Sequence, residues 1–133
     1  MRLNVLLAAG CSAGALAIAI ACSSSTSSNC GSGTPPSLVG TYALQSLTIG
    51  AATPLTPPAE TGTLRFHAST YAIALAGALA QADTGNYTVT GSSCIAENGL
   101  YQFTGTFNLS GTTLTVSGAQ SNQAVASVWT KTS

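Results

Sequence analysis

The stretch "LYQFTGTFNLSGTTLTVSG", residues 100–118, decides the fold class of this chain. Apolar and polar residues alternate strictly from Tyr101 to Leu109. After the short turn signal Ser110-Gly111, the alternation resumes at Leu114 against a series of threonines. A period of two places the apolar side chains on one face of a strand, so the stretch predicts two half-buried strands joined as a β-hairpin.

Similar alternation recurs in six further segments, which predicts about eight short strands in all. The segments are 38–49, 62–66, 71–75, 86–90, 93–97 and 124–132. Asn98-Gly99 is a strong turn signal before the opening stretch. Residues 76–83, "AGALAQAD", predict either a single helical turn or a loop.

An antiparallel sheet of this kind must protect its edge strands from pairing with other chains. Closure into a barrel removes the edges altogether. We therefore predict an all-β fold, a small antiparallel up-and-down barrel of about eight strands over residues 37–133. A sandwich of two sheets has a similar pattern and stays open as the alternative.

Aromatic residues dominate the predicted interior. A barrel of eight strands is just wide enough to be filled by side chains or to hold one small molecule. With this many aromatic rings we expect a mostly filled core. If the barrel does hold a ligand, we expect its walls to be Tyr42, Phe66, Tyr71, Tyr87, Tyr101 and Phe103.

The sparse charges exclude several classes of function. The chain has three Lys or Arg, three Asp or Glu and one His among 133 residues, with no basic run to attract nucleic acid. One histidine without a CxxC or HExxH motif predicts no metal site and no cofactor. Three polar residues are close in sequence: Glu60, Arg65 and His67. They provide neither a nucleophile with a general base nor the pair of carboxylates that acid–base catalysis needs. We therefore expect no catalytic residue, with His67 and Arg65 on a solvated strand face.

The first 21 residues predict a secretory signal peptide that is cleaved from the mature protein. Arg2 supplies the positive start, and a mostly apolar run from Val5 to Ala21 follows it. This run is short for a membrane span and rich in weakly hydrophobic Ala and Gly. Cleavage is therefore favoured over the alternative, an uncleaved transmembrane helix.

"AIAC", residues 19–22, follows the apolar run, precedes a Ser-rich stretch and resembles the lipobox of bacterial lipoproteins. The resemblance implies cleavage before Cys22 and attachment of acyl chains to it, which anchors a protein stably in a membrane. Residues 22–36 are then the lipidated cysteine and a flexible Ser/Gly/Pro-rich tether. Cys11 is a weaker candidate because the apolar region before it is too short. An ordinary signal peptide with a coincidental cysteine is the other alternative.

The lipobox resemblance also predicts which cysteines remain available for a disulfide bond. Cleavage there removes Cys11, and the lipid occupies Cys22, which leaves Cys30 and Cys94 as an even pair in an oxidising compartment. We expect a disulfide bond between them. Without lipidation the mature chain would hold three cysteines, an odd number.

A second resemblance covers most of residues 37–133. "LVGTYALQSL" (38–47), "TPLTPP" (53–58), "GTLRF" (62–66) and "GTFNLSGTTLTVSG" (105–118) look like the lipocalin-like small barrels of secreted bacterial proteins. In that group a G-T-[WY] motif lies on the first strand and an aromatic-bearing strand follows a G-x-L motif. The group is mostly of unassigned function, and its relatives with full-length barrels bind small apolar ligands.

Together these resemblances imply an exported protein, anchored by lipid in the bacterial cell envelope, that acts as a non-enzymatic binding or envelope-associated module. Its partners are then the membrane, through the anchor, and either a small apolar ligand or an envelope protein. The first alternative is a carrier of a small apolar ligand in the barrel interior. The second, less favoured, is a small enzyme acting near His67.

Overall fold

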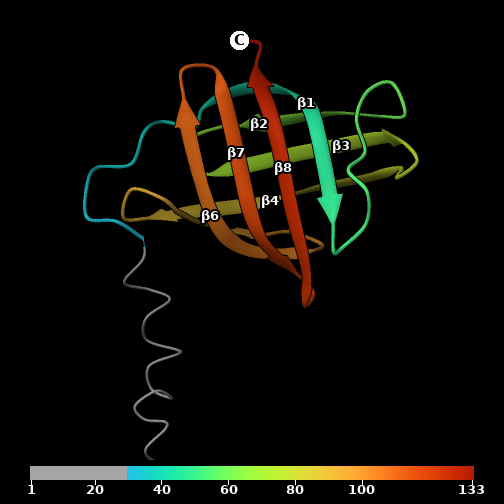
Figure 1. Cartoon of the computed structure of the whole chain (residues 1–133). Coiled ribbons are helices and arrows are strands. Elements are labelled where there is room, and N and C mark those ends of the chain that lie inside the picture. Colours follow the sequence, from blue (N-terminus) through green and yellow to red (C-terminus); the bar gives the residue numbers. More distant parts are fainter. Residues whose placement is uncertain (1–29) are drawn as a thin grey trace, which may run out of the picture. The chain divides into compact units, whose positions relative to one another are not determined.

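A computed structural model describes residues 30–133, which contain eight strands and no helix. Each strand pairs antiparallel with the next, and β8 pairs with β1, so the sheet closes into an up-and-down barrel (Figure 1). The predicted barrel is confirmed, and the sandwich is excluded. The strands are β1 (Gly40–Ile49), β2 (Glu60–Phe66), β3 (Thr70–Gly77), β4 (Gln81–Thr90), β5 (Cys94–Asn98), β6 (Gln102–Ser110), β7 (Thr113–Gln120) and β8 (Gln123–Lys131).

The predictions made for the N-terminal segment lie outside the described residues. They are the signal peptide through Ala21 and the lipid on Cys22, and both stay predictions. The described part of the chain holds no helix with the length and hydrophobicity needed to cross a bilayer. Cys30 is the first described residue, and it forms the predicted disulfide bond with Cys94, the first residue of β5.

The prediction for residues 76–83 is wrong, because these residues belong to a hairpin. β3 continues to Gly77, three residues turn, and β4 begins at Gln81. In β4 the inward series starts with Gln81 and Asp83 and becomes apolar only at Tyr87. Polar side chains at inward positions removed the alternation that identifies a strand.

One end of the barrel, where β1 begins and β8 ends, is filled by aromatic rings; we call it the closed end. Tyr42 packs edge-on against Phe66 with ring centroids 6.1 Å apart, and Phe66 packs against Tyr87 at 4.7 Å. The Tyr42 hydroxyl donates a hydrogen bond of 2.9 Å to the Leu38 carbonyl. This bond fixes the segment before β1 at the closed end.

A β-bulge lets β1 face the interior along its whole length. Tyr42 and Leu44 are buried, the register against β8 then shifts between Leu44 and Ser46, and Leu47 is the next buried residue. The extra residue moves the inward series from even to odd positions. β1 therefore contributes to the closed end and also to the opposite end of the barrel.

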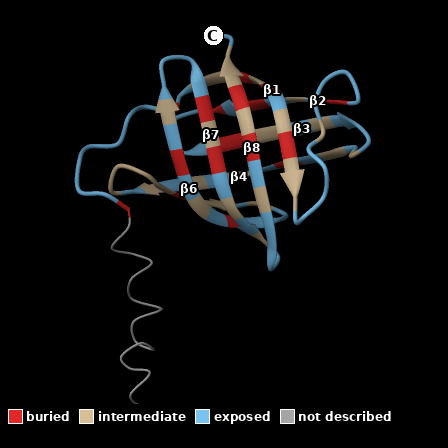
Figure 2. Cartoon of the chain, in the orientation of Figure 1, coloured by how far each residue is buried: buried red, intermediate tan, exposed pale blue. Residues whose placement is uncertain are grey.

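Burial is uneven along the barrel (Figure 2). The buried segments of β7 and β8 lie toward the closed end, whereas their opposite ends are largely exposed. At that end Gly118 faces Gly105 across β6 and β7, and a Cβ on Gly118 would lie 2.8 Å from the Phe103 ring. Glycine here lets the two strands bend and leaves room for the ring.

Candidate functional site

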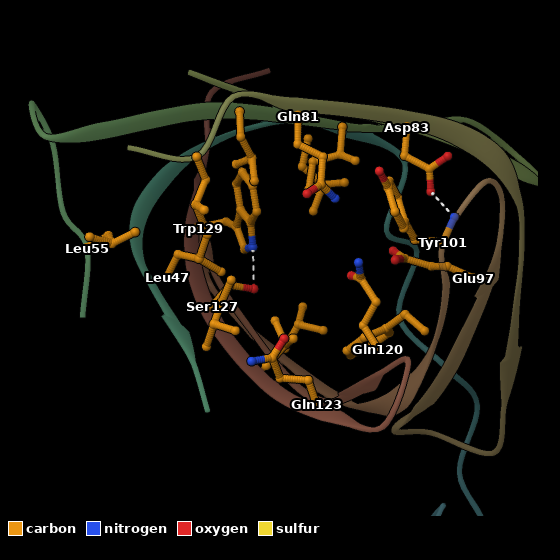
Figure 3. Close-up of a pocket in the computed structure, with 18 of the residues that line it drawn as sticks. Leu47, Leu55, Gln81, Asp83, Glu97, Tyr101, Gln120, Gln123, Ser127 and Trp129 are labelled. Carbon is orange, nitrogen blue, oxygen red and sulfur yellow. Dashed lines mark hydrogen bonds between the residues drawn. The ribbon is translucent and has the colours of Figure 1, made fainter. Parts of the chain in front are cut away.

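The end of the barrel opposite the closed end is hollow. A cavity of about 580 Å³ lies between the strands there, partly open to solvent (Figure 3). The expectation of a mostly filled core is therefore wrong for this half of the molecule. Most of the inward side chains here are aliphatic or polar, and three of the predicted interior aromatics pack at the closed end instead. Aliphatic side chains, which are smaller or more flexible than aromatic rings, bound this volume. They are Leu47, Ile49, Leu64, Ile73, Leu75, Val116 and Val125.

The mouth of the cavity lies where β1 ends and β8 begins. The β1–β2 connection forms part of the wall, and Leu55 in it is held by two backbone hydrogen bonds with Leu47, of 2.8 and 2.9 Å. From the β3–β4 turn, the Leu79 amide donates a bond of 2.8 Å to Oε1 of Glu60, which is fully buried. Glu60 thereby fixes Leu79, another wall residue, at the rim. The rim is thus held by specific bonds on two sides.

Polar side chains occupy part of the cavity wall. They are Thr53, Gln81, Asp83, Glu97, Gln120, Gln123 and Ser127. Ser127 accepts a hydrogen bond of 2.8 Å from the indole N–H of Trp129 and so satisfies the only tryptophan of the chain. Figure 3 places Asp83, Glu97 and Gln120 on one side of the cavity, with Trp129 and Leu47 on the other. The cavity therefore has a polar, acidic side and an apolar side.

Asp83 is a fully bonded carboxylate. Its Oδ2 accepts bonds from the Tyr71 hydroxyl at 2.7 Å and the Tyr101 amide at 3.2 Å. Its Oδ1 accepts bonds from the amides of Leu100 at 2.7 Å and Thr84 at 2.9 Å. Burial raises the pKa of Asp83, but these four bonds outweigh that effect and hold the pKa below its ordinary value. Asp83 is thus ionised, and it ties the β5–β6 turn to β4.

Glu97 is the second carboxylate on the cavity wall. It lies on β5, between Tyr87 of β4 and Phe103 of β6. No residue between 30 and 133 donates a hydrogen bond to its carboxylate. Burial, and then the negative charge of Asp83, raise the pKa of Glu97 to about 7. One wall thus carries a carboxylate that is ionised at neutral pH beside one that titrates near neutral pH.

The tyrosine beside this pair stays protonated. Burial first, and then the hydrogen bond to Asp83, raise the pKa of Tyr71. No Lys, Arg or His is among the residues that line the cavity. Within residues 30–133 no three His, Cys, Asp or Glu residues are grouped so that they could hold a metal ion. The wall can therefore offer negative charge and hydrogen-bond acceptors to whatever enters.

The structure divides the six predicted wall aromatics into two sets. Tyr71, Tyr101 and Phe103 line the cavity. Tyr42, Phe66 and Tyr87 form the aromatic layer of the closed end instead.

The residues considered for catalysis do not come together. His67 is exposed beyond the last residue of β2, and the Arg65 Nε–H donates a 3.3 Å bond to the Thr41 hydroxyl. Glu60 is buried at the opposite end of the same strand. His67 is not among the residues that line the cavity.

Sequence reasoning missed the polar members of the wall. In the sequence, Asp83 and Glu97 are two of a few scattered charges, and the expectation for Gln81 is a helical turn or a loop. The signal that could have found them is a polar side chain in the inward phase of a strand, such as Glu97 two residues after Ile95. A buried polar group at such a position needs a partner, and one source of partners is a ligand.

Comparison with known proteins adds no functional assignment. No family model matches the sequence. No curated protein and no solved structure is significantly similar to it. The function must therefore be argued from the geometry of the cavity.

Proposed function

We propose that this protein is a binding module that holds one small, partly apolar molecule inside its barrel. The observation that carries this proposal is the cavity of about 580 Å³. Pockets that enclose small ligands measure about 300–1,000 Å³, with mostly apolar walls and a few polar groups that fix orientation. The aliphatic wall residues and the acidic side of this cavity match that description.

The cavity is preformed, which supports the same function. Its walls are strands of a closed barrel, and each strand is hydrogen-bonded to a neighbouring strand on both sides. The rim is held by the Leu47–Leu55 backbone bonds and by the bond from Leu79 to Glu60. A ligand would therefore enter without the entropy cost of ordering a mobile wall.

The binding function is tested with N-phenyl-1-naphthylamine, an uncharged dye whose fluorescence increases in apolar surroundings. We expect the dye to bind the mature protein with increased fluorescence. Val125→Trp places a large ring in the cavity, where Val125 is a wall residue, and should weaken dye binding about tenfold or more.

Ala126→Trp is the matched control, because Ala126 is the next residue of β8 and is exposed. This variant should bind the dye like the wild type. Absence of a fluorescence change with the wild type, or equal binding by both variants, would rule out the cavity as the binding site. Thermal unfolding of both variants checks that each is folded.

We further propose that the protein is exported and anchored in the bacterial envelope through lipid on Cys22. The Cys30–Cys94 disulfide supports export, because such bonds persist in oxidising compartments and are rare in the cytosol. The lipobox-like residues 19–22 support the anchor. Because Leu38 is fixed at the closed end, a chain anchored upstream would join the barrel at the end opposite the mouth. The mouth would then stay accessible to solutes.

Intact mass of the protein from a membrane fraction tests the anchor. We expect the mass of residues 22–133 plus acyl groups, because the lipobox directs cleavage before Cys22. Cys22→Ser should remove the acyl mass and release the protein from the membrane. A wild-type mass that includes Met1, or that shows an unmodified Cys22, contradicts the anchor.

A further inference from the structure

We propose that the cavity selects cations: its ligand is an organic amine with an apolar body, whose ammonium group binds the carboxylate of Glu97 beside Asp83. This inference rests on the proposed binding function and names the chemical class of the ligand. Two independent observations support it. One is the cavity itself, and the other is the Glu97 carboxylate, which points into it without a donor from the described chain.

The charges of the described chain are distributed in an unusual way. Glu60 and Asp83 are buried and Glu97 is half-buried, so none of the three side-chain carboxylates of residues 30–133 is fully exposed. Arg65 is exposed, and the ammonium of Lys131 lies 5.8 Å from the centre of the Tyr42 ring, at the closed end. No basic group of the described chain therefore neutralises the acidic side of the cavity. A buried charge is costly unless it is paired, and a cationic ligand would supply the partner.

The two carboxylates have different parts in this site. A carboxylate has about four lone-pair positions, and the four donors to Asp83 occupy them. Asp83 therefore acts on a ligand through its charge. The lone pairs of Glu97 receive no donor from residues 30–133, so Glu97 is the direct acceptor for an ammonium N–H. The side-chain oxygen of Gln120, on the same side of the cavity, can accept a further bond.

The opposite side of the cavity determines the rest of the ligand. Trp129 and Leu47 lie across from the acidic pair, and both are buried. An apolar ring or chain attached to the ammonium would contact them and would be removed from water. The ligand is thus amphipathic, with a single positive end. An anion of the same shape would be repelled by Asp83 and by ionised Glu97.

Binding should depend on pH through Glu97. The titratable groups around it are Asp83 and Tyr87 on β4, Tyr71 on β3 and Tyr101 in the β5–β6 turn. Asp83 is ionised throughout the neutral range, and burial raises the pKa of both Tyr71 and Tyr87. Glu97 changes its charge near neutral pH, so amine binding should strengthen as the pH rises through about 7.

The test uses three naphthalene compounds of similar shape and different charge. They are the cation 1-naphthylmethylamine, the neutral alcohol 1-naphthalenemethanol and the anion 1-naphthaleneacetate, which is the conjugate base of 1-naphthaleneacetic acid. Calorimetric titration of the mature, disulfide-bonded protein at about pH 8 should give an affinity for the amine about tenfold or more above that for the alcohol. The acetate should bind more weakly than the alcohol. At about pH 5.5, where Glu97 is protonated, most of the advantage of the amine should be lost.

Two variants assign the selectivity to Glu97. Glu97→Gln should lower the affinity for the amine about tenfold and leave the affinity for the alcohol unchanged. Arg65→Gln removes a charged group that is exposed and lies outside the cavity wall, and it should keep the preference for the amine. Thermal unfolding with and without each compound verifies that both variants are folded and reports binding independently.

The outcomes separate this inference from the proposed function. If the alcohol or the acetate binds as tightly as the amine, or if Glu97→Gln keeps the preference, the cation selectivity is wrong while binding in the barrel stands. If neither these compounds nor the uncharged dye bind, the binding function itself fails. A preference for the amine that requires Glu97 and weakens below neutral pH supports both.

Discussion

Replacing Cys30 and Cys94 together by serine is expected to lower the free energy of unfolding by about 4 kcal/mol. The disulfide closes a loop of 65 residues, counted from Cys30 through Cys94. A cross-link over a loop of this length removes much of the conformational freedom of the unfolded chain. The total stability of a small domain is about 5–15 kcal/mol, so the loss would be a large part of it. Urea denaturation of the variant and the wild type under non-reducing conditions measures the difference.

Reduction provides the control for this prediction. A reductant should bring the wild type to the stability of the double variant and should leave the variant unchanged. If the two proteins differ by less than about 1 kcal/mol, the bond does not constrain the unfolded chain in the expected way. A barrel that is filled at one end only has a small core, which is why we expect it to depend on the bond and on an oxidising compartment.

Raising the pH from about 4.5 to about 8 is expected to lower the stability of the wild type by about 2–3 kcal/mol through Glu97 alone. Burial and then the charge of Asp83 raise the pKa of this carboxyl from 4.5 to about 7 in the folded state. The unfolded chain thus loses the proton first. The stabilisation is complete below the pKa of the unfolded state and is lost as the pH rises through about 7. Chemical denaturation at a series of pH values measures the slope.

Glu97→Gln tests the origin of this slope. The variant cannot ionise at this position, so it should be about 2–3 kcal/mol more stable than the wild type at about pH 8 and nearly equal to it at about pH 4.5. The same slope in both proteins would contradict the assignment to Glu97. Asp83 acts in the opposite direction: its pKa is lowered, so its contribution is present above the ordinary value of 3.8 and is lost as the pH falls through the lower folded value.

The ionisation of Glu97 connects the stability of the protein to its proposed function. The ionised form of Glu97 destabilises the folded protein, and a bound ammonium would relieve that cost. An amine should therefore stabilise the wild type most at high pH, where the protein without ligand is weakest. Functional sites often carry such locally unfavourable charges.

Much of the fold was predictable from local patterns. The alternation from Tyr101 to Leu109 corresponds to β6, and the turn signal Ser110-Gly111 joins it to β7. The start of β4 was not predictable in this way, since Gln81 and Asp83 take inward positions that apolar residues usually occupy. The pattern identified strands whose inward side chains are apolar, and it failed at the start of β4, where polar side chains face the cavity.

The candidate site was predictable only in part. Tyr71, Tyr101 and Phe103 line the cavity as aromatic wall residues, whereas Tyr42 and Phe66 fill the closed end. All of these were expected to point inward, and alternation cannot tell at which height in the barrel an inward residue lies. That height follows from the register between strands and from the bulge in β1, which depend on partners distant in sequence.

The sequence by itself determined the strands, the faces of most of them, and an all-β fold with few charges, because a strand repeats every two residues and this period is local. Only the tertiary structure decided that the barrel closes with β8 against β1 and that its aromatic rings gather at one end. It also placed Glu97 beside Asp83 at the hollow end. The physical reason is that a cavity is bounded by side chains from all sides of a closed sheet, so its volume and charge arise from contacts between residues far apart in the chain.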